Sequence, residues 1–199
     1  DKTGTFYLLQ IRPIVDTKEM LDEDLTAIPD DQVLLRSNNS LGHGIMNEIH
    51  DIIYVKTDDY SASHNQEIAW EIEKLNQQFL DEGRNYVLVG PGRWGSSDTW
   101  LGIPVKWPHI CASRLIVEVA LKNYRVEPSQ GTHFFQNLTS FGVGYFTVDG
   151  NAGNGLFRKD ILDAMPAVEE TRYVRHVRFD APLKIMMDGK KQCGVVLLP

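Results

Sequence analysis

The chain has 199 residues, of which 42% are hydrophobic and 24% are charged, and its formal net charge is -7. This composition excludes a disordered tail and predicts one sizeable core, in one domain or one domain with a short appendage. The negative charge also excludes non-specific nucleic-acid binding. Cys111 and Cys193 have no metal-ligand spacing and form no disulfide framework. Since no apolar run reaches membrane-spanning length, we expect a cytoplasmic protein with no membrane partner.

The first predicted element is a strand at residues 5–12, which are rich in aromatic and branched side chains. Pro13 ends this strand, because proline has no amide hydrogen to donate to a ladder. A strand so close to the first residue implies a partner strand upstream, so we expect the chain to be a piece of a longer protein. Residues 16–31 are acidic and poor in large apolar side chains, which is typical of a linker. We therefore expect a mixed α/β domain at residues 32–199.

The next elements are two strands separated by a polar loop. Residues 32–36 and 52–55 have the composition of strands, and residues 37–44 are rich in Ser, Asn and Gly. Further along, the unbroken apolar run at 86–89 predicts a strand that is covered on both faces. The glycine-rich loop at residues 90–97 then lies at the carboxyl end of that strand.

Between these strands, the spacing of apolar residues predicts a helix. Four of them recur at intervals of four, three and four residues, and they are Ile68, Ile72, Leu75 and Phe79. This spacing forms one stripe on a helix, and Gly83 supplies a stop signal.

The second half of the chain alternates strands and short helices. Residues 115–119 and 143–148 predict strands, residues 130–140 a short helix or an ordered loop, and residues 156–165 a helix that Pro166 ends.

The C-terminal region is predicted to be β-structure. Residues 173–179 alternate strictly between apolar and basic side chains, which is typical of a strand. Residues 183–187 and 193–198 flank the turn pair Asp188 and Gly189, which predicts a hairpin. The expected fold class is thus α+β, or mixed α/β, with a mixed sheet, a few helices and a C-terminal β-hairpin.

Residues 7–13 read Tyr-Leu-Leu-Gln-Ile-Arg-Pro. This run resembles the closing strand of the ATP-grasp domain in phosphoenolpyruvate synthases and pyruvate phosphate dikinases. The resemblance implies that residues 1–15 close such a domain, that Gln10 lies by Mg²⁺ and the triphosphate of ATP, and that Arg12 contacts phosphate. It implies an upstream ATP-grasp domain as partner, and ATP and Mg²⁺ as cofactors of the full-length protein. The family's paired glutamate precedes Asp1, so the isolated chain is not expected to bind ATP tightly.

Residues 85–146 contain the runs Gly-Pro-Gly-Arg-Trp-Gly-Ser-Ser-Asp, Leu-Gly-Ile-Pro-Val-Lys-Trp and Gly-Thr-His-Phe-Phe-Gln-Asn-Leu-Thr-Ser-Phe-Gly. They are similar to the C-terminal region of bacterial phosphoenolpyruvate synthase-like proteins. This resemblance implies ATP-dependent phosphoryl transfer to pyruvate or a related acceptor by the full-length protein. The family's phosphoryl-carrier run Gly-Gly-x-x-Ser-His and the Cys-Gly motif of its pyruvate-binding barrel are absent. The alternative is therefore a non-catalytic ligand-binding or docking module attached to an ATP-grasp relative.

The glycine-rich loop has two interpretations. It can form an anion loop for a phosphorylated small molecule, because glycines let amide groups approach a ligand while a guanidinium and hydroxyls bind it. The residues of this predicted loop are Gly90, Gly92, Arg93, Gly95, Ser96 and Ser97. It can equally be a tight turn with Trp94 packed beneath it and Arg93 paired with a carboxylate.

His133 is the candidate for proton transfer, since a histidine titrates near neutral pH. The alternative is a buried, hydrogen-bonded histidine with a structural role. Whether Arg93, Ser96, His133 and Asn137 share one cleft depends on the tertiary structure, so the sequence leaves that question open.

Overall fold

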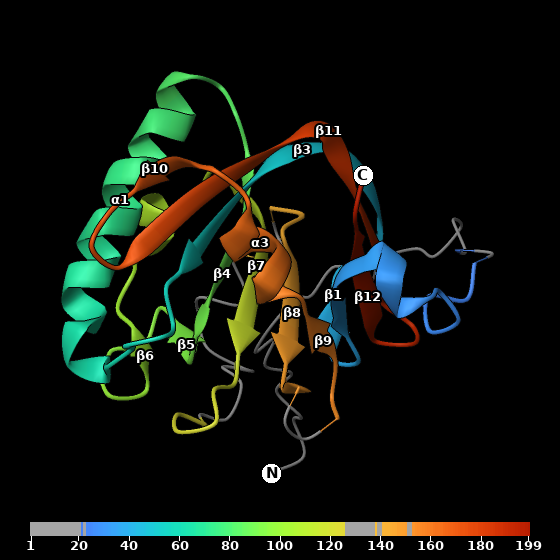
Figure 1. Ribbon diagram of the computed structural model, residues 1–199, viewed down its shortest axis with the longest axis horizontal. Coiled ribbons are helices and arrows are strands. Elements are labelled where there is room, and N and C mark those ends of the chain that lie inside the picture. Colours follow the sequence, from blue (N-terminus) through green and yellow to red (C-terminus); the bar gives the residue numbers. More distant parts are fainter. Residues whose placement is uncertain (1–20, 22, 126–137, 139–140, 151–152) are drawn as a thin grey trace, which may run out of the picture.

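The computed structural model describes residues 21, 23–125, 138, 141–150 and 153–199 (Figure 1). Within these residues, ten strands form one mixed sheet that curls into a half-barrel, and two α-helices pack against it. The predicted α+β class and mixed sheet are therefore confirmed.

The ten strands of the sheet, in chain order, are β1 (Val33–Ser37), β2 (Ser40–Leu41), β3 (Gly44–Val55), β4 (Tyr86–Pro91), β7 (Ser113–Val119), β8 (Gly144–Val148), β9 (Leu156–Phe157), β10 (Ala167–Glu170), β11 (Val174–Asp188) and β12 (Cys193–Leu197). A separate two-stranded sheet consists of β5 (Arg93–Trp94) and β6 (Gly102–Ile103). The helices are α1 (Asn65–Asp81), α3 (Lys159–Ala164) and the short 3-10 helices η1 (Asp30–Gln32), η2 (Ala62–His64) and η3 (Trp107–His109).

The strand order is β2-β8-β7-β4-β3-β11-β12-β1-β9, and β10 pairs with β11. In this sheet, the four neighbouring strands β3, β4, β7 and β8 run parallel to one another. All other strand pairs of the ten-stranded sheet are antiparallel. Parallel strands place their carboxyl ends at one edge, so the segments that follow them gather there.

The sheet is covered on both faces. The stripe from Ile68 to Phe79 on α1 is buried against one face, which confirms the predicted helix. Leu162 of α3 packs against the other face, inside the curl, with Val117 and Phe146. Figure 1 shows α1 alongside the sheet and α3 over its hollow. Strand β4 lies between these two layers and is buried along its whole length, as its apolar run predicts.

The C-terminal hairpin is confirmed, but its first strand is longer than predicted. Residues 173–179 and 183–187 were expected as separate strands, and they belong to one strand, β11, which pairs with β12. The pairing of β11 with β3 shifts between Arg178 and Leu183. Pro182 lies within this irregular stretch, where the absence of an amide hydrogen is tolerated.

Two other predictions are wrong in part. Residues 156–157 were expected to be helical, but they pair with β1 as β9, and α3 begins only at Lys159. The polar loop at 37–44 includes β2, which pairs with β8, and β3 starts at Gly44 and not at Ile52. In each case the strand forms because a partner distant in the sequence supplies its hydrogen bonds, which outweighs local composition.

Part of the predicted linker packs on the sheet. Leu25 is only 1% exposed and lies in one cluster with Met186, Cys193 and Val195. Burial of this leucine fastens the segment before β1 to the hairpin. No helix within the described ranges combines the length and apolar character that crossing a bilayer requires.

Candidate functional site

A pocket of about 170 Å³ opens at the carboxyl ends of β7 and β8, beside the glycine that follows β4. Among the described residues, its polar lining consists of two acidic groups, one guanidinium, two amides and one hydroxyl, which belong to Glu118, Asp149, Arg125, Asn39, Asn154 and Thr147. Ligand sites in α/β sheets commonly lie outside the carboxyl ends of the strands. This position makes the pocket the candidate functional site.

Sheet register brings the pocket residues together. Glu118 on β7 is paired with Thr147 on β8, so both lie at the same level of the parallel ladder. The Thr147 amide and hydroxyl each donate to the Asn39 carbonyl at 3.2 Å, which places the β1–β2 turn at the pocket. Beyond β8, the backbones of Asp149 and Asn154 exchange two hydrogen bonds of 2.8 and 2.9 Å. These two bonds hold Asp149 and Asn154 together at the pocket.

Glu118 is a nearly buried acidic side chain, 6% exposed, one residue before the end of β7. The Trp94 amide donates to its Oε1 at 3.0 Å, and the Tyr145 hydroxyl donates to its Oε2 at 2.5 Å. Hydrogen bonds to an ionised group are among the stronger ones in proteins. Glu118 therefore joins β7 to the segment after β4 and to β8, and it holds an acidic side chain at the pocket.

The predicted loop at 90–97 is partly β-structure, because Gly90 and Pro91 end β4 and residues 93–94 form β5, with a turn at Gly92 beside the buried Trp94. The four consecutive amides from Gly92 to Gly95 donate to protein oxygens at 2.9 to 3.4 Å. Trp94 is 1% exposed, and its Nε1 donates to the Val117 carbonyl at 3.0 Å. Amides engaged in this way do not point at a ligand, so these contacts favour the turn interpretation. The anion-loop hypothesis stays a prediction that rests on the Arg93 side chain and on the hydroxyls of residues 96 and 97.

Two glycines of this loop have packing roles. A Cβ atom at Gly90 would lie 2.4 Å from the Trp94 ring, and one at Gly92 would lie 2.6 Å from the Tyr124 ring. Gly92 also has a φ of +69°, which favours glycine. The Tyr124 hydroxyl donates to the Trp100 carbonyl at 2.8 Å, and burial raises its pKa, so it stays protonated near neutral pH. Both glycines thus allow aromatic rings to pack against the backbone.

The structure places only some of the predicted site residues. Gln10, Arg12, His133 and Asn137 lie outside the described residues. Gly92 lines the pocket. Gly90 belongs to β4, Arg93 belongs to β5, and Gly95, Ser96 and Ser97 follow β5; these five residues are not among the pocket's described lining residues. Across the described ranges, no group of three or more His, Cys, Asp or Glu side chains is arranged to hold a metal ion. The predicted Mg²⁺ ligand, Gln10, is outside those ranges.

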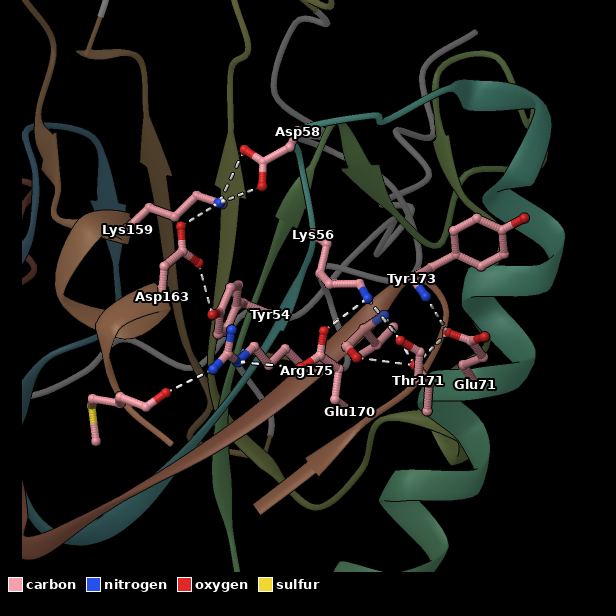
Figure 2. Close-up of polar contacts among 12 residues, drawn as sticks. Tyr54, Lys56, Asp58, Glu71, Lys159, Asp163, Glu170, Thr171, Tyr173 and Arg175 are labelled. Atoms are coloured by element: carbon pink, nitrogen blue, oxygen red, sulfur yellow. Dashed lines mark hydrogen bonds and ion pairs between the residues drawn. The ribbon is translucent and has the colours of Figure 1, made fainter. Parts of the chain in front are cut away.

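Figure 2 shows a second polar cluster, where α3 meets the end of β3. Lys159 Nζ lies 2.6 Å from the Asp163 carboxylate and 3.4 Å from that of Asp58. The Tyr54 hydroxyl donates to Asp163 at 2.9 Å. Burial, followed by the bond to Asp163, raises the pKa of Tyr54, so its hydroxyl stays a donor near neutral pH. These contacts fix α3 over the sheet.

The same cluster continues to β10 and α1 (Figure 2). Lys56 donates to the Glu170 carboxylate at 3.0 Å and to the Thr171 carbonyl at 2.8 Å. Glu71 of α1 accepts hydrogen bonds from the Thr171 hydroxyl at 2.6 Å and from the Tyr173 amide at 3.0 Å. Apart from the Lys159–Asp163 pair within α3, the contacts described here join elements that are far apart in the sequence, so we assign this cluster a structural role.

Sequence reasoning did not identify the pocket residues Glu118, Arg125 and Asp149. A signal was present, since Glu118 is the one charged residue in the predicted strand 115–119, and Asp149 directly follows the predicted strand 143–148. Polar groups at strand ends become informative once strands are known to run parallel. Comparison with protein-family models, with curated proteins and with solved structures yields no match for this chain.

Proposed function

We propose that this domain binds a small polar molecule in the pocket at the carboxyl ends of β7 and β8. We propose further that it does so as the C-terminal part of a phosphoenolpyruvate synthase-like phosphotransferase. The first proposal rests on the pocket itself, where Glu118, Arg125 and Asp149 line one cavity at the edge of a parallel sheet. The second rests on the resemblance of residues 7–13 and 85–146 to that family.

The polar side chains of the pocket are suited to binding a small polar ligand. Glu118 is held by two donors, so its position is set before a ligand arrives. Binding to groups that are already oriented avoids the free-energy cost of ordering them. Arg125 offers a planar guanidinium, which matches carboxylate and phosphate oxygens. A small anion-bearing molecule is therefore the ligand class that we propose.

Binding predicts a thermal shift that depends on Arg125. At a ligand concentration of about 100 times Kd, binding to the native state alone adds about 2.7 kcal/mol. For a chain of this size, that raises the melting temperature by roughly 5 to 10 °C. We expect such a shift with at least one small carboxylate or phosphate in a panel that includes pyruvate and phosphoenolpyruvate, and we expect Arg125→Gln to abolish it.

The matched control is Arg172→Gln, because Arg172 is exposed and does not line the pocket. This variant should show the same shift as the unaltered chain. If every compound leaves the melting temperature unchanged, or if Arg125→Gln responds as the unaltered chain does, the pocket is not a binding site for this class.

The phosphotransferase proposal predicts Mg²⁺-dependent ATP turnover by the full-length protein. Replacing Arg12 with alanine should lower turnover about a hundredfold, because an arginine that stabilises phosphoryl charge contributes on the order of 3 kcal/mol in the transition state. Lys2→Ala is the control, since the resemblance assigns Lys2 no role, and its turnover should be unchanged. Equal turnover of the Arg12→Ala and unaltered proteins would remove the support for phosphoryl transfer.

A further inference from the structure

A second cavity, of about 410 Å³, lies at the same edge of the sheet as the candidate site. Its described walls are two segments that follow parallel strands, residues 57–62 after β3 and residues 121–124 after β7. Strand β4 lies between β3 and β7 and is parallel to both, so the two walls stand on either side of its carboxyl end. Small-molecule sites have volumes of roughly 300 to 1,000 Å³ and often lie at this edge, so both size and position suit a ligand.

Two tyrosine rings form a fixed part of the cavity wall. The rings of Tyr60 and Tyr124 meet edge to face, with their centroids 5.1 Å apart. The Tyr60 hydroxyl donates to Asn65 Oδ1 at 2.8 Å, and the Tyr124 hydroxyl donates to the Trp100 carbonyl at 2.8 Å. Burial raises the pKa of both tyrosines, so they keep these bonds near neutral pH. The rings are therefore in position before a ligand binds, which avoids the cost of ordering them.

The polar groups of the cavity include donors and acceptors of several kinds. Thr57 contributes a hydroxyl, Asn123 an amide and Lys122 an ammonium, and no hydrogen bond or ion pair joins these three side chains to another described residue. Asp58 contributes a carboxylate, which is 85% exposed and lies 3.4 Å from Lys159 (Figure 2). Hydroxyls and amides both donate and accept, an ammonium only donates, and a carboxylate only accepts. A ligand whose own groups both donate and accept matches all of them, and hydroxyl groups do so.

The combination of aromatic rings with hydrogen-bonding groups of both kinds favours a sugar. A sugar ring carries hydroxyls around its edge and C–H groups on its faces, and C–H groups are attracted to the negative face of an aromatic ring. An apolar molecule would desolvate the Asn123 amide and the Thr57 hydroxyl without giving them partners, which costs free energy. A phosphate or carboxylate without a sugar would pair with Lys122 but would leave both tyrosine rings without a contact.

We propose that this second cavity binds a sugar ring. The C–H groups of the sugar lie against Tyr60 and Tyr124, and its hydroxyls exchange hydrogen bonds with Thr57, Lys122 and Asn123. The second cavity shares no described lining residue with the pocket at the ends of β7 and β8. The sugar site therefore does not depend on the proposed function.

Nuclear magnetic resonance titration of the ¹⁵N-labelled 199-residue chain tests this assignment. The probes are D-glucose, D-galactose, D-mannose and D-ribose. Two comparison compounds each lack one feature: tetrahydropyran-2-methanol keeps the ring but has no ring hydroxyls, and sorbitol keeps the hydroxyls but has no ring. We expect at least one sugar to bind about tenfold more tightly than either compound, because each compound loses one of the two kinds of contact.

Substitutions in the wall locate the bound sugar. Asn123→Ala should weaken its binding about fivefold, the effect of losing one net hydrogen bond. Tyr124→Leu should weaken it about tenfold, because the aromatic ring is lost, whereas Tyr124→Phe keeps the ring and should bind almost as the unaltered chain does. Asn47→Ala is the matched control, since Asn47 is exposed and does not line the cavity, and it should leave the affinity unchanged. Asn123 is also exposed, so its variant carries the test if Tyr124→Leu does not fold.

Two results would overturn the sugar assignment at once. One is that none of the four sugars binds, and the other is that sorbitol binds as tightly as the best sugar. Binding that is equally tight in Asn123→Ala and in the unaltered chain would place the sugar elsewhere on the protein and would also contradict the assignment. Arg125 is not among the described lining residues of this cavity, so failure here leaves the small-anion proposal to its own test.

Discussion

Replacing Asp51 with alanine is expected to lower the free energy of unfolding by about 3 kcal/mol, because it removes a buried carboxylate that pairs with three basic side chains. The Asp51 side chain is 3% exposed, and its Oδ1 lies 2.8 Å from His176 Nε2. Its Oδ2 accepts a hydrogen bond of 2.5 Å from Arg178, and Arg84 lies 3.5 Å from Oδ1. The Asp51 carboxylate thus pairs with three basic side chains. His176 and Arg178 belong to β11, and Arg84 belongs to the segment after α1.

The expected loss is at the lower end of the range for buried pairs, for a reason seen in the structure. The side chains of Arg84 and Arg178 are 34% and 40% exposed, so water can solvate them when the carboxylate is removed. His176 is 4% exposed, and it loses its partner without gaining water. The cost therefore arises chiefly at the buried imidazole, where an unsatisfied polar group is expensive.

Urea denaturation followed by circular dichroism measures this effect. Asp58→Ala is the matched control, because Asp58 is 85% exposed and its ion pair with Lys159 lies at the surface, where such pairs contribute about 0 to 1 kcal/mol. Asp51→Asn is the milder variant, to be used if the alanine variant does not fold. Equal stabilities of the Asp51→Asn and Asp58→Asn proteins would show that the cluster does not stabilise the fold.

Replacing Trp94 with alanine is expected to cost about 4 kcal/mol, the largest loss that we predict, because it leaves a cavity beneath the turn that borders the pocket. The indole is 1% exposed and belongs to the cluster between the sheet and α1. Its Nε1 also donates to the Val117 carbonyl, which would lose that partner. Gly90, whose Cβ would overlap the ring, shows how closely the backbone packs on Trp94.

Trp100→Ala is the control, since Trp100 is 67% exposed and the same atoms are removed from solvent-facing surface. Its unfolding free energy should change by less than about 1 kcal/mol. Trp94→Phe keeps part of the ring and should fall between the two. If Trp94→Ala and Trp100→Ala unfold at the same urea concentration, the turn is not anchored by its tryptophan.

Trp94 also connects the stability of the turn to the pocket. Its amide donates to Glu118, so a collapse of the turn would free one oxygen of the pocket carboxylate. Substitution of the indole therefore affects both stability and the pocket. It opens a cavity in the core, and it loosens the pocket wall beside Gly92. Ligand titration of the Trp94→Phe protein can separate these effects, as that variant retains the backbone donor.

Elements that depend on short-range patterns were predicted well. The stripe on α1, the doubly buried strand β4 and the hairpin of β11 and β12 each follow from periodicity or turn residues within a few positions. Predictions failed where pairing with distant segments decides the structure, as for β9 beside β1 and for the early start of β3. The same contrast applies to the candidate site. The packing of Trp94 beneath the glycine-rich segment was one of the two interpretations of the local sequence, whereas the pocket depends on strands that are distant in the sequence.

Amino-acid order alone specified the α1 stripe, the apolar core strands and the glycines of the turn, because these arise from interactions between near neighbours in the chain. Tertiary structure decided the strand order, and with it the meeting of Glu118 with Trp94 and of Asp51 with His176. These partners lie 24 and 125 residues apart, and no local pattern encodes which strands become neighbours. The charged pocket exists because parallel strands end at one edge of the folded sheet, so its chemistry became visible only in three dimensions.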